Sequence, residues 1–371
     1  MNDERKIPAK IEDVLGRVEA YYGGVMDWLV RLYDPKTGGF YMALSGAEDP
    51  SIEPAIEMTA WAIYYLYDYT EAPLTMPKEF KDGIIKFIND RQDPKTGIFI
   101  DRQGPANPRE TARNQDAALN ALAYLGADTR YPHPRNTSSS AADIPIMPAY
   151  MSSTESYIKW IESMDWEHGS WTAGDQTQSS LQYVNMLGPS AREKYKAALF
   201  SWLEDRQQSN GFFSPDFDFN AVSGAFKVGL VYATYEKKLP NYDKIIDSIF
   251  ECYKVAKTKN PFYVRNPISV LNQMAAYSPD AKAKIQSGII ENIDAVLASF
   301  SEFLCPDGAF SASKGASMVS FGGVVGSHGL FEGDIDATLM MLIARKTLYA
   351  IFDMAAPPLD TTHFWDKIIS K

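Results

Sequence analysis

The chain has 371 residues, of which 45% are hydrophobic and 13% aromatic, and its 36 basic and 47 acidic side chains give a formal net charge of -11 at pH 7. This composition is that of a folded globular protein and argues against extensive disorder. The negative charge opposes binding to DNA or RNA, because their phosphates would be repelled. We therefore expect no nucleic-acid partner.

No segment approaches the roughly 20 apolar residues that cross a membrane as a helix, and the charged N-terminus does not resemble a secretory signal. We therefore expect no membrane span and a cytoplasmic location. Only Cys252 and Cys305 are present. Two cysteines give no disulfide framework, which fits a reducing compartment.

The sequence DPKTG occurs at residues 34–38 and 93–97, and an aromatic residue, Phe40 or Phe99, follows each copy. Looser copies with a Gly and an aromatic residue occur at 167–171, 209–213 and 306–310. Pro cannot extend a preceding helix, Asp and Thr bond to nearby backbone groups, and Gly accepts a positive φ, so each copy predicts a helix-ending turn. Recurrence at intervals of about 40 to 60 residues indicates stacked repeats.

Helical patterns flank these turns along the chain. The first pair ends near residue 33 and resumes over 52–69, and the second covers 77–90 and continues from residue 110. Later pairs cover 158–164 and 176–187, 195–207 and 221–235, and 289–304 and 333–352. Between them a copy without Gly, at residues 260–263, precedes a helix over 268–277. We therefore predict six helical hairpins in a single domain, residues 1–371.

Two segments interrupt the helical pattern. Residues 128–151 contain several prolines and a run of serines, and we predict a long loop that either joins repeats or covers a site. The Gly- and Ser-rich residues 311–329 separate the last two helices.

Hairpins that repeat head to tail with Gly-x-aromatic turns resemble the (α/α)6 toroid of terpenoid cyclases and protein prenyltransferases. The turns are also similar to those of (α/α)6 carbohydrate enzymes, such as unsaturated glucuronyl hydrolases and N-acylglucosamine epimerases. The resemblance implies an all-α fold in which an inner ring of helices lies inside an outer ring. It also implies that the segments after the turns lead to inner helices whose N-termini meet at one cavity mouth.

The candidate functional residues are polar and aromatic side chains near those N-termini. A buried carboxyl whose pKa is raised by a like charge can act as an acid, whereas the alternative role for each acid is helix capping. Aromatic residues either form platforms for a substrate or pack the helix ends. The candidate catalytic residues are Glu57, Asp116, Asp175, Asp334 and Asp336. The candidate substrate-binding residues are Arg113, Asn114, Trp171, Phe213, Tyr263 and His328.

The motifs of two toroid chemistries are incomplete in this chain. Class II terpenoid cyclases carry Asp-x-Asp-Asp, whereas Ala337 follows Asp334 and Asp336 here. Zinc-dependent prenyltransferases need Asp, Cys and His, and neither cysteine lies in an Asp-x-Cys arrangement. We predict no metal site and no cofactor.

Three functions remain open from the sequence. The first is a carbohydrate enzyme, a hydrolase, lyase or epimerase, that uses carboxylates at the cavity mouth and acts on a small-molecule or oligosaccharide substrate. The second is a terpenoid-cyclase-like enzyme that acts on an isoprenoid. The third is a toroid that binds a ligand or a protein without catalysis. The sequence does not predict an oligomeric state.

Overall fold

The computed structural model describes residues 6–104, 108–134 and 147–371. Regular structure in these residues is helical except for one two-stranded hairpin, which confirms the prediction of an all-α fold. Within this part of the chain, no helix has the length and apolar character needed to cross a membrane.

The chain divides into two compact units. Unit 1 consists of residues 1–14, 141–299 and 344–355, and unit 2 consists of residues 15–140, 300–343 and 356–371. The arrangement of a single toroid domain remains a prediction.

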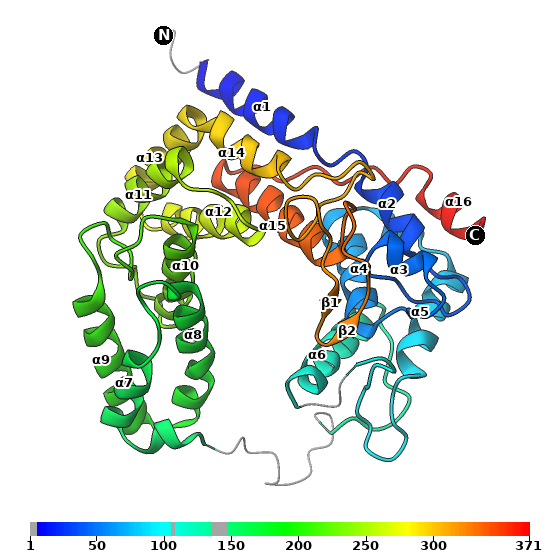
Figure 1. The fold of residues 1–371 in the computed structure, drawn as a ribbon, viewed down its shortest axis with the longest axis horizontal. Coiled ribbons are helices and arrows are strands. Elements are labelled where there is room, and N and C mark those ends of the chain that lie inside the picture. The colour runs from blue at the N-terminus through cyan, green and yellow to red at the C-terminus, as the bar shows by residue number, and fades with distance from the viewer. Residues whose placement is uncertain (1–5, 105–107, 135–146) are drawn as a thin grey trace. The chain divides into compact units, whose positions relative to one another are not determined.

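Unit 2 is built from helical hairpins, a small β-hairpin and the C-terminal helix (Figure 1). Helix α4 packs against α6, and α16 packs against α2. The elements assigned to unit 2 are α2 (Val25–Leu32), α3 (Leu44–Glu48), α4 (Ile56–Tyr69), η1 (Ala72–Thr75), α5 (Lys78–Asn89), α6 (Pro108–Tyr124), β1 (Ser320–Phe321), β2 (Val324–Val325), the first half of α15 (Ile335–Ile351) and α16 (Phe364–Ile369).

Unit 1 is a group of packed helices in which α10 contacts both α8 and α12 (Figure 1). Small residues allow the close approach of α8 and α10, because a Cβ on Gly224 would lie within 3.0 Å of Ser170. The elements of unit 1 are η2 (Ala149–Ser152), α7 (Thr154–Glu162), α8 (Ser170–Met186), α9 (Pro189–Arg206), α10 (Phe219–Thr234), α11 (Tyr242–Val255), α12 (Phe262–Ala275) and α13 (Pro279–Glu291), with most of α14 (Ile293–Ser301) and part of α1 (Lys6–Glu19).

Three turns of unit 2 share one construction. In each turn an aromatic residue forms an antiparallel bridge with the end of the preceding segment, and the aromatic side chain is fully buried. Its backbone N–H donates to a polar side chain of α4, α6 or α15. The aromatic residues and their acceptors are Phe40 with Thr59, Phe99 with Gln115, and Phe310 with Thr338. The repeated motif therefore joins the two helices of a hairpin.

Within the DPKTG turns, the predicted local bonds are present. The Asp93 carboxylate accepts hydrogen bonds from the backbone N–H groups of Lys95 and Thr96, both at 2.8 Å. Asp34 accepts from Lys36 in the same way, at 3.1 Å. These contacts stabilise the turn that the motif forms.

The turns of unit 1 depart from the pattern at two places. Gly169 has a φ of -118°, and Trp171 already belongs to the first turn of α8, which begins at Ser170. The copy without Gly also differs, because α12 begins at Phe262 and its Tyr263 is helical. The predicted helix starts at residues 176 and 268 were therefore too late by about one and a half turns.

The predicted loop over residues 128–151 is described at its two ends, whereas residues 135–146 lie outside the described part of the chain. The first end is fixed by side chains at the end of α5 and just after it. Asn89 accepts from the Arg130 N–H at 3.0 Å, and Gln92 accepts from the Tyr131 N–H at 2.8 Å. His133 is buried and stacks on Phe99.

We expect Gly97→Ala to be much more destabilising than Gly126→Ala. Both glycines have a positive φ, 72° and 61°, so both variants pay a backbone cost of about 1–2 kcal/mol. A Cβ at Gly97 would also lie 2.0 Å from the Pro132 carbonyl oxygen, whereas nothing lies within 4 Å at Gly126. The total loss for Gly97→Ala should reach about 2–5 kcal/mol. Urea unfolding followed by circular dichroism measures both losses, and equal losses would contradict the close approach.

Candidate active site

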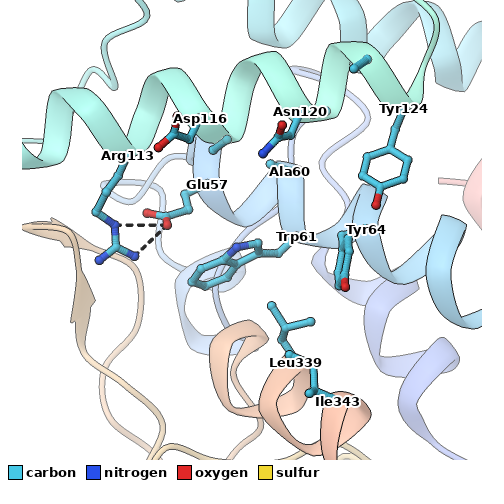
Figure 2. A pocket seen from close by; sticks show the side chains of 13 residues that line it. Glu57, Ala60, Trp61, Tyr64, Arg113, Asp116, Asn120, Tyr124, Leu339 and Ile343 are labelled. Atoms are coloured by element: carbon cyan, nitrogen blue, oxygen red, sulfur yellow. Dashed lines mark hydrogen bonds and ion pairs between the residues drawn. The ribbon is translucent and has the colours of Figure 1, made fainter. Parts of the chain in front are cut away.

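A cavity of about 820 Å³ lies in unit 2 among α4, α6 and α15. Its volume is within the range of sites that bind small molecules. Figure 2 shows charged and amide side chains and aromatic rings around it, with aliphatic side chains of α15 beside them. The lining residues are Glu57, Ala60, Trp61, Tyr64, Arg113, Asp116, Ala117, Asn120, Ala121, Ala123, Tyr124, Leu339 and Ile343.

Helical spacing explains why these residues share one face. On α4, Glu57, Trp61 and Tyr64 recur at intervals of four and three residues, which places them on one side of the helix. On α6, Asp116 and Asn120 follow the same rule. Alanines lie between these positions on both helices. Small residues leave room for a cavity between two packed helices.

An ion pair lies at one end of the cavity (Figure 2). The Arg113 guanidinium donates to Glu57 Oε1 from Nη2 at 2.7 Å and from Nε at 3.3 Å. The guanidinium carbon also lies 4.2 Å from the ring centre of Phe321, which belongs to β1. Phe321 in turn contacts the Trp61 ring edge to face, with ring centres 4.8 Å apart. The β-hairpin therefore covers the charged end of the cavity.

Asp336 is a buried acid in the first turn of α15, close enough to this ion pair for their charges to interact. The residue is only 3% exposed. Burial raises the pKa of Asp336 to about 7, and the negative charges of Asp334 and Glu57 add to this effect while Arg113 opposes it. Near neutral pH this carboxyl can therefore both hold and release a proton.

Asp334 lies two residues earlier and has a different environment. One oxygen accepts from the Ala337 N–H at 2.8 Å and so caps α15, and the other accepts from the N–H groups of Ala312 at 2.8 Å and Met318 at 3.0 Å. Burial raises the pKa of Asp334 to about 6, although these three bonds favour the charged form. Asp334 joins the 311–318 segment to α15, which gives it a clear structural role.

Glu332 is a third buried acid in this region, with a residue exposure of 7%. It accepts from both the N–H and the hydroxyl of Ser45. The Ser317 hydroxyl donates to it at 3.2 Å. These bonds attach the Gly- and Ser-rich segment to α3.

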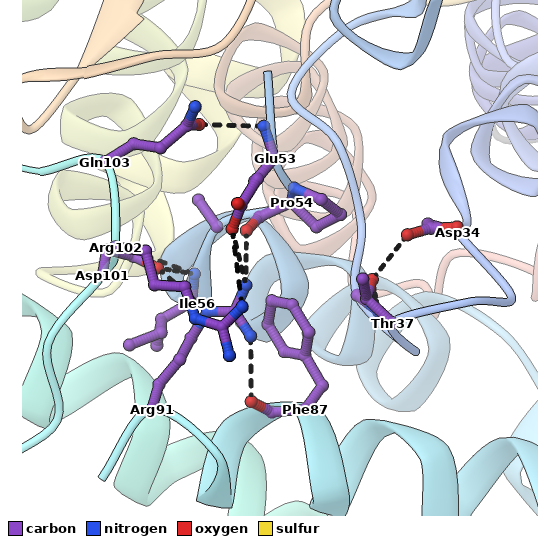
Figure 3. A network of polar contacts seen from close by, with 12 residues as sticks. Asp34, Thr37, Glu53, Pro54, Ile56, Phe87, Arg91, Asp101, Arg102 and Gln103 are labelled. Atoms are coloured by element: carbon purple, nitrogen blue, oxygen red, sulfur yellow. Dashed lines mark hydrogen bonds and ion pairs between the residues drawn. The ribbon is translucent and has the colours of Figure 1, made fainter. Parts of the chain in front are cut away.

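A further buried network lies at the start of α4 (Figure 3). The α4 N-cap residue, Ala55, offers no side-chain acceptor, and the Ile56 N–H instead donates to the Asp101 carboxylate at 3.0 and 3.1 Å. Asp101 Oδ1 also lies 3.5 Å from Nε of the buried Arg91. Burial raises the pKa of Asp101 to about 6, with the Ile56 N–H and Arg91 opposing the shift.

Arg91 has additional partners in this network. Its guanidinium donates to the carbonyl oxygens of Phe87 and Pro54, both at 3.1 Å, and lies over the Phe87 ring. Glu53 is a more distant ionic partner at 3.9 Å. Because Ile56 precedes Glu57, this network holds the first turn of α4 next to the cavity.

The structure brings together some of the predicted site residues. Glu57, Arg113 and Asp116 line the cavity. Asp336 is not among the lining residues, but it is buried and near enough to Glu57 and Arg113 for their charges to affect its pKa. Asn114 follows Arg113 on α6 and is not among the lining residues.

His328 also belongs to unit 2, but it has a different partner. Its Nε2 lies 3.0 Å from Asp49 Oδ2, and its backbone N–H donates to the Ser45 hydroxyl at 2.9 Å. The imidazole is half exposed. These contacts tie the segment before α15 to α3 and to Asp49, which follows α3.

The other predicted residues belong to unit 1. Asp175 pairs with Lys227 at 2.6 Å. Trp171 contacts the ring of Tyr263, with ring centres 5.9 Å apart, and Phe213 is fully buried. These contacts show that the three aromatic residues pack within unit 1. Their role in substrate binding and the common mouth for all the candidates remain predictions.

Sequence reasoning did not select several residues of the cavity. Trp61 and Tyr64 lie four and seven residues after Glu57, and Asn120 and Tyr124 lie four and eight residues after Asp116. That spacing was the available signal, since helix positions at these intervals share a face. Phe321 offered no such signal because it comes from the segment between α14 and α15.

Among the described residues, no three His, Cys, Asp or Glu side chains are grouped so that they could hold a metal ion. Both cysteines are buried, and burial raises the pKa of the Cys252 thiol to about 12 and that of Cys305 to about 11. Comparison of the chain with protein families, with curated proteins and with solved structures gives no match.

Proposed function

We propose that unit 2 carries the active site of a carbohydrate-processing enzyme. The observation that supports this proposal is the combination of carboxyl groups and aromatic rings in one cavity of about 820 Å³. A sugar offers hydroxyl groups, which polar side chains bind, and C–H faces, which pack on aromatic rings. Glu57, Asp116 and Asn120 match the first property, and Trp61 and Tyr64 match the second.

Cleavage of a glycosidic bond requires two carboxyl groups. One is an acid that donates a proton, and the other is a carboxylate that acts as base or nucleophile. In this proposal Asp336 is the acid, because its pKa of about 7 keeps a proton available at neutral pH. Asp116 is the second carboxylate, since it lines the cavity from α6. Arg113 holds Glu57 in a fixed position. Hydrolysis of a glycosidic bond is the first reaction to test, and lyase and epimerase reactions use the same kind of proton transfer.

The ionic lining favours this function over an isoprenoid substrate. A hydrocarbon chain would displace water from Glu57, Arg113 and Asp116. It would offer these groups no hydrogen bonds in place of those to water. We also propose the (α/α)6 toroid as the scaffold of this enzyme. Both units would contribute helical hairpins to it.

A ligand screen tests the proposed function. We expect oligosaccharides to raise the melting temperature of the full chain and isoprenoid diphosphates to leave it unchanged, and we expect chromatography to detect a carbohydrate product. Trp61→Ala should remove the shift because the ring platform is lost. Phe331→Ala is the matched control, since this aromatic residue of unit 2 is 54% exposed and does not line the cavity.

Three outcomes would count against the proposal. A shift with isoprenoid diphosphates alone would support the terpenoid alternative. Carbohydrate binding without any product would support a non-catalytic binding protein. No shift in melting temperature with either library would argue that the cavity is not a ligand site.

A further inference from the structure

The cavity is elongated and follows the two helices that form its walls. From Glu57 to Tyr64 the lining covers seven residue steps of α4, or about 10 Å, and from Arg113 to Tyr124 it covers eleven steps of α6, or about 16 Å. These lengths exceed what a single sugar ring needs. The cavity therefore has room for contacts at two separate places.

The end opposite the ion pair is aromatic. Figure 2 shows Tyr64 and Tyr124 at this end, with Trp61 between them and the Glu57–Arg113 pair. The rings of Tyr64 and Tyr124 have centres 6.1 Å apart, and Tyr67 lies 5.1 Å from Tyr124. The Tyr124 hydroxyl donates to Asp68 at 3.0 Å, which orients the ring. A second ring-binding position is thus built at a distance from the charged residues.

The charge of the lining distinguishes among oligosaccharides. The lining contains two carboxylates, Glu57 and Asp116, and one guanidinium, Arg113, which is already paired with Glu57. An anionic sugar would meet an acidic wall and a protein with a net charge of -11. A neutral sugar avoids this repulsion.

We propose that the cavity binds a neutral oligosaccharide of more than one ring, with one ring at Glu57, Arg113 and Asp116 and another against Tyr64 and Tyr124. This inference rests on the proposed function and adds the length and the charge of the substrate. The ring at the ionic end is the one that reacts. The ring at the tyrosine end contributes binding alone.

Calorimetric titration of the full-length protein tests the inference with defined probes. The probes are neutral β-1,4-linked glucose and N-acetylglucosamine oligomers of one to four rings, and oligogalacturonates of the same lengths. We expect the affinity for the neutral oligomers to rise by about 2- to 10-fold when a ring reaches the tyrosine end, because packing on an aromatic ring stabilises the complex. Oligogalacturonates should bind more weakly than neutral oligomers of equal length.

Substitutions of Tyr124 test the second position directly. Tyr124→Ala should remove the gain in affinity with chain length and leave binding of the single ring unchanged, whereas Tyr124→Phe, which keeps the ring, should retain the gain. The wild-type series alone is decisive if the alanine variant does not fold.

The outcomes separate this inference from the proposed function. Affinity that is independent of chain length, or equal weakening of short and long probes by Tyr124→Ala, overturns the second ring position and leaves the proposed function intact. Tighter binding of oligogalacturonates overturns the neutral substrate. No binding of any carbohydrate, including wider libraries, overturns both proposals.

Discussion

Asp336→Asn is expected to lower turnover by about 10²–10⁴-fold and to stabilise the protein above pH 7. The loss of turnover follows from the removal of the acid, whose contribution is usually of this size. The gain in stability follows from burial, because the folded protein must hold a carboxylate at a site that is 3% exposed. The same residue would then support catalysis at a cost in stability.

The pH dependence of this gain has a definite sign. The pKa of Asp336 is about 7 in the folded protein and about 3.8 in the unfolded chain, so the folded state holds more protons between these values. Stability from this group is complete below pH 4 and is lost as the pH rises to 7. This difference in the pKa of Asp336 corresponds to at most about 4 kcal/mol in the free energy of unfolding. Since asparagine is never charged, the variant should gain about 1–3 kcal/mol over the wild type at pH 8 and little at pH 4.5.

Urea unfolding at pH 4.5 and pH 8 measures this difference without any substrate. Asp116→Asn is the matched control, because this exposed carboxyl undergoes the same chemical change. Its free energy of unfolding should change by less than about 0.5 kcal/mol at both pH values, while turnover falls. A stability difference for Asp336→Asn that does not vary with pH would show that Asp336 is not protonated by burial. Turnover that survives both substitutions would exclude these carboxyls from the chemistry.

The repeat made part of this site predictable. Three site residues lie in the first two turns of a helix that comes after an aromatic turn: Glu57, Arg113 and Asp336. The aromatic turns before these helices share one construction in unit 2. Position in the repeat therefore indicated which segments to compare. Helical spacing then extends the list from Glu57 to Trp61, since both lie on one face of α4.

Other features depend on tertiary contacts that no local pattern encodes. Asp334 and Asp336 look alike in the sequence, yet only Asp334 meets three backbone N–H groups, two of which come from the segment before α15. Phe321 reaches Arg113 from a hairpin far along the chain. The start of α8 at Ser170 was missed because Gly169 and Trp171 imitate a turn that the backbone does not form.

Asp101→Ala is expected to destabilise the protein by about 2–4 kcal/mol, whereas Asp101→Asn should cost less than about 1 kcal/mol. Alanine removes the acceptor for the Ile56 N–H and leaves the buried Arg91 with the Phe87 and Pro54 carbonyls and the distant Glu53. Asparagine keeps an oxygen at the same place. Because burial raises the pKa of Asp101 to about 6 against the effect of Arg91, loss of the negative charge itself should be tolerated, and increasingly so as the pH rises above 6.

The two variants also differ in their expected effect on the cavity. Ile56 begins α4 and Glu57 follows it, so an uncapped first turn would release Glu57 from Arg113. Carbohydrate binding should therefore weaken in Asp101→Ala and persist in Asp101→Asn, which urea unfolding and calorimetry on the same samples can establish. Equal destabilisation by the two variants would mean that the charge on Asp101, paired with Arg91, matters more than the cap. In that case the start of α4 would be held mainly by electrostatic attraction, and the protein would lose stability as the pH falls far enough to neutralise Asp101.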